Sequence, residues 1–206
     1  MRKDLAVLPG TVDQDIRRVL MWLDDYVSAP HPDLGRSGDV CPFVRVARMR
    51  RHATLALRYD VEGGSGDEVA EAVREEMGEF SQQVPAQTTT RIVVFPAIPD
   101  QCWEVVDEVY SELKDEAVGQ GLMIGQFHPR CREPAVRNPA FPVSRSPLPL
   151  FALRWMAVHD ILFLGDRKHW FDRYRARFGT QHQNGRVSDP LLRERYAEAL
   201  RRYDYR

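Results

Sequence analysis

The stretch GQFHPRCREPAVRNPAFPVSRSPLPLFALRWMAVHDILFL, residues 125–164, has two halves of different amino-acid composition and has the largest influence on the predicted fold. Its first half holds His128, Cys131 and four arginines among six of the chain's 14 prolines. Its second half is almost continuously apolar. Because prolines fix φ and lack an N–H donor, other parts of the chain must hold the first half in place. We expect a rigid cationic loop that belongs to a pocket and leads into a buried helix over 150–164.

Strands and helices alternate along the chain. Apolar runs bounded by turn residues predict strands over 43–49, 53–61, 91–96 and 122–127, the first two close enough to pair as a hairpin. Amphipathic spacing predicts helices over 11–27, 67–80, 100–119, 150–164, 168–178 and 188–203. A polar segment, 81–90, is expected to form a surface loop. This order predicts one α+β domain over residues 1–206: a mostly antiparallel sheet of about four strands, helices on one face and a helical C-terminal part.

Composition narrows the class of protein. The chain has 206 residues, 43% hydrophobic and 29% charged, with a formal net charge of −1, which argues against a general attraction to nucleic acid. Three cysteines without a CxxC pair favour a reducing compartment over a disulfide framework. The N-terminal apolar run is too short for a signal peptide, and charged residues interrupt 148–164. We expect a cytoplasmic protein with no nucleic-acid or membrane partner.

His128 and Cys131 are the first candidates for chemistry. His128 follows the strand over 122–127; its imidazole can ligate iron, in haem or without it, or simply bond to the loop backbone. Cys131 can be a ligand or a nucleophile whose pKa Arg130 and Arg132 lower, or a small buried residue. The two residues cannot complete a closed zinc site, because two more ligands are needed and no second tight pair exists.

Four loop arginines suit carboxylates or phosphates, haem propionates among them. They are Arg130, Arg132, Arg137 and Arg145. The alternative is that they pair with Glu133 and with acids on the helices.

The predicted helix over 150–164 contains Arg154, His159 and Asp160, and buried charged groups need partners. Arg154 and His159 are candidate catalytic residues that would orient a substrate. The alternative is an internal ion pair between Arg154 and Asp160.

Aromatic residues of this region could wall a flat apolar cofactor or form ordinary core. They are Trp103, Phe127, Phe141, Phe151, Trp155 and Phe163. The phosphate loops GxGxxG and GxxxxGK[ST] are absent, as are HExxH and GxSxG, so the commonest dehydrogenase, kinase and hydrolase types are not indicated.

The segments CPFV (41–44), FHP (127–129) and RSPLPLFALRWMAVHDILFL (145–164) resemble a group of small bacterial proteins with a domain of unknown function. More distantly, the strand that ends in His128-Pro129, the arginines after it and the helical C-terminal part resemble the YqcI/YcgG family of haem-dependent N-oxygenases. Cys131 and the proline-rich loop depart from the pattern of that family.

The resemblance to the YqcI/YcgG family implies a haem-dependent monooxygenase of specialised metabolism that hydroxylates nitrogen of a small amine or amino acid. His128 would ligate the iron, and His159 or Arg154 would orient the substrate. The cofactor-binding arginines would be Arg130, Arg132, Arg137 and Arg145. Electrons would come from peroxide or an external reductase, and a homodimer stays an open alternative.

Two other functions stay open. One is a cofactor-free accessory protein whose loop binds an anionic ligand through Arg132 and Arg145. The other is a transferase that uses Cys131 as nucleophile, with His128 or His159 as its base.

Overall fold

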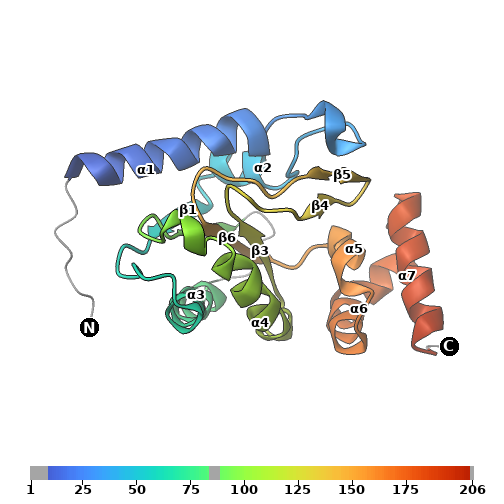
Figure 1. Ribbon diagram of the computed structural model, residues 1–206. Helices are drawn as coiled ribbons and strands as arrows, with labels where there is room; N and C mark the ends of the chain where they lie inside the picture. Colours follow the sequence, from blue (N-terminus) through green and yellow to red (C-terminus); the bar gives the residue numbers. More distant parts are fainter. Residues whose placement is uncertain (1–8, 84–88, 205–206) are drawn as a thin grey trace.

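The computed structural model describes residues 9–83 and 89–204, and has helices on both sides of a four-stranded sheet (Figure 1). The strands are β1 (Ala53–Leu57), β2 (Thr90–Val94), β3 (Leu122–Phe127), β4 (Pro134–Ala135), β5 (Asn138–Pro142) and β6 (Leu150–Trp155). The α-helices are α1 (Pro9–Trp22), α2 (Val44–Met49), α3 (Gly66–Ser81), α4 (Val105–Gly119), α5 (Ile161–Leu164), α6 (Lys168–Gln183) and α7 (Pro190–Arg202). The expectations about a signal peptide and about the middle of the 81–90 loop concern residues outside the described ranges.

The main sheet has the strand order β1-β2-β6-β3. β1 and β2 are parallel, so the chain crosses over between them through α3. β6 is antiparallel to both of its neighbours, β2 and β3. These pairings confirm the predicted α+β class with a mostly antiparallel sheet.

The prediction of one helix over 150–164 is wrong for its first half. Residues Leu150–Trp155 form β6, and only the 3-10 turn Val158–Asp160 and α5 are helical. Phe151 and Leu153 pack with α3 and α4, whereas Leu150 packs on the other face of the sheet. A strand covered on both faces is an unbroken apolar run, which local periodicity does not distinguish from a buried helix.

The prediction of a strand over 43–49, and of its hairpin with the next strand, is also wrong. These residues form the short helix α2, in which Val44 and Ala47 are buried three residues apart. Val46 and Met49 are exposed on the other side of this helix. The alternation of apolar and polar residues therefore reflected one helical face rather than two faces of a strand.

Both faces of the main sheet are covered. The helices α3 and α4 pack on one face, as expected, around Val93, Phe151 and Leu153. The opposite face, which carries Ile92 and Val94, is covered by α1, the π-helical turn Leu23–Val27 and α2 (Figure 1). The sequence predicted a helix near α1 without placing it on this second face.

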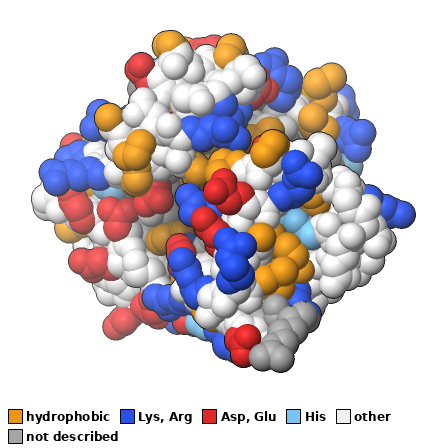
Figure 2. All heavy atoms as spheres, turned by 90° about the vertical axis from the view of Figure 1, so that its right-hand side faces the viewer, with side chains coloured by type: hydrophobic (Ala, Val, Ile, Leu, Met, Phe, Trp, Pro, Cys, Tyr) orange, Lys and Arg blue, Asp and Glu red, His pale blue; other side chains and the backbone are white. Residues whose placement is uncertain are grey.

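The helices α5, α6 and α7 form a third apolar cluster beside the sheet, which confirms the predicted helical C-terminal part. Phe171 and Tyr174 on α6 are fully buried within it. The surface over this end of the molecule shows Lys and Arg side chains interspersed with Asp and Glu (Figure 2). None of the helices in the described ranges has the length and apolar character that a membrane span requires.

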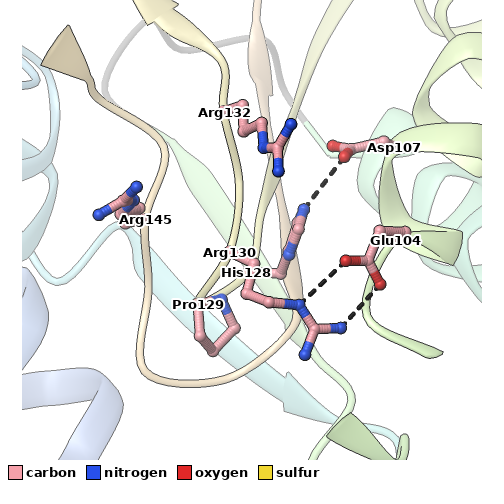
Figure 3. Close-up of a pocket in the computed structure, with 7 residues that line it drawn as sticks. All are labelled: Glu104, Asp107, His128, Pro129, Arg130, Arg132 and Arg145. Atoms are coloured by element: carbon pink, nitrogen blue, oxygen red, sulfur yellow. Dashed lines mark hydrogen bonds and ion pairs between the residues drawn. The ribbon is translucent and has the colours of Figure 1, made fainter. Parts of the chain in front are cut away.

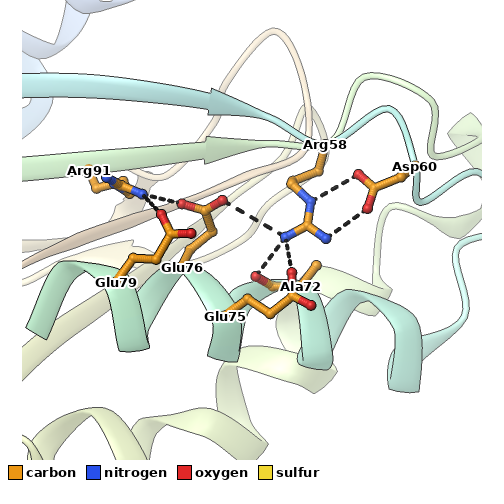
Figure 4. Close-up of polar contacts among 7 residues, drawn as sticks. All are labelled: Arg58, Asp60, Ala72, Glu75, Glu76, Glu79 and Arg91. Carbon is orange, nitrogen blue, oxygen red and sulfur yellow. Dashed lines mark hydrogen bonds and ion pairs between the residues drawn. The ribbon is translucent and has the colours of Figure 1, made fainter. Parts of the chain in front are cut away.

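A buried carboxylate joins α3 to the parallel strands (Figure 4). Glu76, which is 5% exposed, lies between Arg91 of β2, at 2.5 Å, and Arg58 just after β1, at 3.8 Å. Asp60 and Glu79 bind the outer sides of the same two arginines. Glu76 is the buried member of this network, so little water is available to solvate its charge if an arginine partner is lost.

We expect Glu76→Gln to lower the free energy of unfolding by about 3 kcal/mol, because two arginines lose their buried counter-charge. Glu79→Gln is the matched control: the Glu79 side chain is 58% exposed, and an exposed ion pair contributes less than about 1 kcal/mol. Urea unfolding of the two variants measures the difference. Equal effects of the two substitutions would contradict the role given to Glu76.

Candidate functional site

A pocket of about 610 Å³ lies where β3 ends, between the first turn of α4 and the proline-rich loop (Figure 3). This volume suits a small molecule. The lining residues are Glu104, Asp107, His128, Pro129, Arg130, Arg132 and Arg145. Four of them, His128, Arg130, Arg132 and Arg145, were predicted as site residues from the sequence, and the structure brings these four together.

Side chains of α1 and of the π-helical turn that continues it hold the far part of the proline-rich loop. Arg18, Trp22 and Tyr26, each four residues after the last, donate hydrogen bonds to loop carbonyls over 2.8–2.9 Å. The acceptors, in the same order, are the carbonyls of Pro147, Arg145 and Val143. The spacings match, because four helical residues rise about 6 Å and two extended residues span about 6.6 Å. We call these three hydrogen bonds the carbonyl ladder.

His128, Cys131 and Asp107 form a compact cluster at the side of the pocket. His128 is 1% exposed, and its Nε2 lies 3.1 Å from Oδ2 of Asp107. Nδ1 of His128 has no hydrogen-bond partner among the described residues, so the ring is held through Nε2. The Cys131 thiol, also 1% exposed, lies 3.8 Å from Oδ1 of Asp107. The three side chains offer one ligand atom each within 4.8 Å of one another.

Burial, with a smaller contribution from the nearby Asp107 carboxylate, raises the pKa of the Cys131 thiol to about 11. Arg130 and Arg132 were expected to lower this pKa. Arg130 does not, because it is bound to Glu104 instead. The enclosed thiol is therefore a poor source of thiolate at neutral pH, which weakens the interpretation of Cys131 as a nucleophile.

Arg130 is neutralised by its neighbours. Its guanidinium makes two hydrogen bonds to the Glu104 carboxylate, at 2.7 and 2.9 Å, and lies over the Trp103 ring. The same ion pair lowers the pKa of Glu104 to about 2. Arg130 therefore forms a rigid, paired wall of the pocket rather than a free anion-binding group.

Arg132 and Arg145 are the open cationic groups of the pocket. Both are exposed, and neither has an ion-pair partner within the described part of the chain. Arg137, which was predicted to act with them, lies elsewhere and pairs with Asp189 at 3.6 Å. Of the four predicted cofactor-binding arginines, Arg130 is paired inside the pocket and Arg137 lies outside it. Arg132 and Arg145 are the two that are available to a ligand.

The predicted catalytic residues Arg154 and His159 are not in this pocket. Arg154 pairs in register with Met123, at the opposite end of β3 from His128, about 17 Å along the strand. Its guanidinium binds the fully buried Asp160 at 2.5 and 2.8 Å, which confirms the alternative of an internal ion pair. His159 is exposed and its ring meets Phe43 edge-on.

Comparison with family models matches residues 16–189 to the domain of unknown function DUF6875. The chain belongs to the DUF6875 family. This confirms the expected membership of an uncharacterised domain group. Neither the curated proteins nor the solved structures contain a match to the chain.

The pocket of this DUF6875 protein does not fit haem. Nε2 of His128 is bound to Asp107, Nδ1 is enclosed, and Pro129 is the one apolar residue of the lining. A haem face needs a broad apolar wall. The aromatic residues proposed for that wall are spread over separate contacts: Trp103 under Arg130, Phe127 against Trp22, Phe141 on His31, Phe151 against Phe95, and Trp155 against Phe80, while Phe163 is exposed.

Glu104 and Asp107 are the lining residues that sequence reasoning missed. A usable signal existed, because α4 is followed directly by β3 and the two have similar lengths. The 15 residues of α4 span about 22 Å. The six residues of β3 span about 20 Å. A helix that turns straight back into a strand of equal length places its first turn beside the last residue of that strand.

Removing one hydrogen bond of the carbonyl ladder should destabilise the protein measurably. Trp22→Phe keeps the aromatic ring and deletes the donor to the Arg145 carbonyl, so the free energy of unfolding should fall by about 1 kcal/mol. Met21→Ala, at an exposed neighbouring position, should change it by less than about 0.5 kcal/mol. Urea unfolding compares them, and indistinguishable variants would contradict a structural role for the ladder.

The folded protein should protect Cys131 from thiol-reactive probes. With iodoacetamide at neutral pH and a chelator present, we expect Cys131 to react roughly 100-fold more slowly folded than unfolded, because burial removes thiolate and blocks access. Cys41 and Cys102, both partly exposed, are the internal controls. Peptide mapping by mass spectrometry measures the three rates. Preferential labelling of Cys131 would instead support a nucleophile.

Proposed function

We propose that this protein binds a small carboxylate-bearing molecule of amino-acid size in the pocket at the end of β3. The observation that carries the proposal is the pair Arg132 and Arg145, two guanidinium groups that line one pocket without an ion-pair partner among the described residues. Guanidinium groups bind carboxylates with directed, charge-assisted hydrogen bonds. Their exposure keeps both groups accessible to a ligand.

The opposite wall of the pocket is acidic. Asp107, from the first turn of α4, keeps 44% of its side chain exposed although it binds His128. Arg132 and Arg145 come from the loop, and Asp107 faces them from the helix side (Figure 3). A ligand with a carboxylate at one end and an ammonium group at the other would match both walls, so an amino acid is favoured over a simple anion.

The more distant resemblance to the YqcI/YcgG family supports the same class of substrate, because that family acts on amino-acid and guanidine nitrogen. Its haem chemistry finds no support in the lining residues, and we derive no oxidation step. The alternative of a transferase is disfavoured by the buried Cys131 thiol.

Calorimetric titration of the full chain tests the proposal with three probes: free α-amino acids, the corresponding amino-acid amides, and inorganic phosphate. We expect amino acids to bind and their amides, which lack the carboxylate, to bind at least tenfold more weakly. Arg132→Gln and Arg145→Gln should each weaken binding about 10–100-fold, because each removes a charge-assisted hydrogen bond of about 1.5–3 kcal/mol.

Arg137→Gln is the matched control, since it removes a loop arginine outside the pocket. This variant should bind like the unaltered protein. An equal loss in all three arginine variants would indicate a general charge effect and overturn the proposal. Failure of every amino acid and every other carboxylate to bind would overturn it as well, and preference for phosphate would replace the ligand class.

A further inference from the structure

We propose that Asp107, His128 and Cys131 form a mononuclear zinc site with its fourth coordination position open to the pocket. Asp107 comes from α4, and His128 and Cys131 come from the loop after β3; neither the family match nor the expected role of His128 toward haem assigns this set. The inference goes beyond anion binding, because uptake of the metal does not require the carboxylate ligand.

The donor set is a zinc donor set. Zinc is bound by cysteine sulfur, histidine nitrogen and carboxylate oxygen, and sites with three protein ligands leave a position for water. With zinc–ligand distances of about 2.0–2.3 Å, the ligand atoms around a tetrahedral zinc ion lie roughly 3.3–3.7 Å apart. The observed separations are 3.1 Å from Nε2 of His128 to Oδ2 of Asp107 and 3.8 Å from the Cys131 thiol to Oδ1 of Asp107. These two separations involve different oxygens of the Asp107 carboxylate, and the three ligand atoms lie within 4.8 Å of one another, so the side chains would have to close by about 1 Å at most to hold an ion.

The backbone presents these ligands rigidly. Asp107 is on the first turn of α4, and His128 directly follows β3. The turn between His128 and Cys131 is closed by the Cys131 amide, which donates to the His128 carbonyl over 3.0 Å. Because β3 packs against α4, the helix ligand and the loop ligands meet without a mobile segment between them.

The open side of the proposed zinc site faces the pocket in which we propose that the carboxylate ligand binds. Asp107 and His128 both line the pocket together with Arg132 and Arg145, whereas Cys131 is enclosed behind them. Binding of zinc at Nε2 would leave the imidazole proton of His128 on Nδ1 and would release the proton of the Cys131 thiol to solvent. The metal would supply a Lewis acid, or a bound water of lowered pKa, next to the carboxylate-binding arginines.

The sequence alone argued against a closed zinc site, because His128 and Cys131 lacked the two further ligands that such a site needs. The missing carboxylate is Asp107, which is 21 residues from His128 in the sequence. The simpler explanation of the cluster is a plain hydrogen-bonded network in which Asp107 accepts from the imidazole and the thiol. Metal titration separates these two explanations.

The experiment strips the full chain with a chelator and titrates it with Co²⁺ and then Zn²⁺. We expect one equivalent of Co²⁺ to produce a thiolate-to-cobalt charge-transfer absorption, and Zn²⁺ to displace it. Cys131→Ser should abolish that absorption and weaken zinc binding at least about tenfold. Substitution of residues that only support metal ligands already costs about 10–100-fold in metal affinity. Cys41→Ser, on the other side of the sheet, should retain both properties.

Asp107→Asn provides a second variant with the thiol intact. It should keep the thiolate signal but bind zinc at least about tenfold more weakly. Absence of stoichiometric metal binding, or a cobalt–thiolate signal that survives in Cys131→Ser, overturns the zinc site. Zinc binding that is lost in Cys131→Ser supports it whether or not any carboxylate binds, so failure of the anion proposal and failure of the metal proposal give different results.

Discussion

The carbonyl ladder is the contact on which the site depends. Residues 142–149 contain three prolines, Pro142, Pro147 and Pro149, so this segment lacks the N–H groups for a regular strand pairing along its length. Its carbonyls instead accept from Arg18, Trp22 and Tyr26. A helix from the start of the chain thereby positions Arg145 across the pocket from α4. Side chains more than 100 residues away in the sequence therefore hold much of the loop in place.

A second constraint fixes the other wall. The strand β3 runs back along α4 over a similar length, so Asp107 near the start of α4 contacts His128 just after β3 without any special motif. Opposed charges in one pocket then follow from the two constraints together: acids from the helix, arginines from the loop. Arg130 shows how the two walls are also joined, since its ion pair with Glu104 crosses between them.

Local patterns predicted those parts of the protein that local forces determine. The α+β class, β3, the amphipathic α3 and α4, and a loop that other elements must hold all followed from apolar spacing and proline chemistry. β6 was mistaken for a helix because a strand buried on both faces has no period of two. Arg154 and His159 were assigned to the site from that predicted helix and from the family resemblance, although Arg154 lies at the opposite end of β3 from His128. Asp107 was missed because its interaction with His128 is a tertiary contact, which no short sequence motif indicates.

The position of β6 also bears on how the protein is assembled. It is the last strand of the main sheet in the sequence, yet it lies in the middle, between β2 and β3. A ribosome therefore releases β1, β2 and β3 before the strand that joins them exists, and the nascent chain carries two unpaired edges until residue 155 has emerged. Such long-range closure makes folding slow compared with a hairpin-first topology.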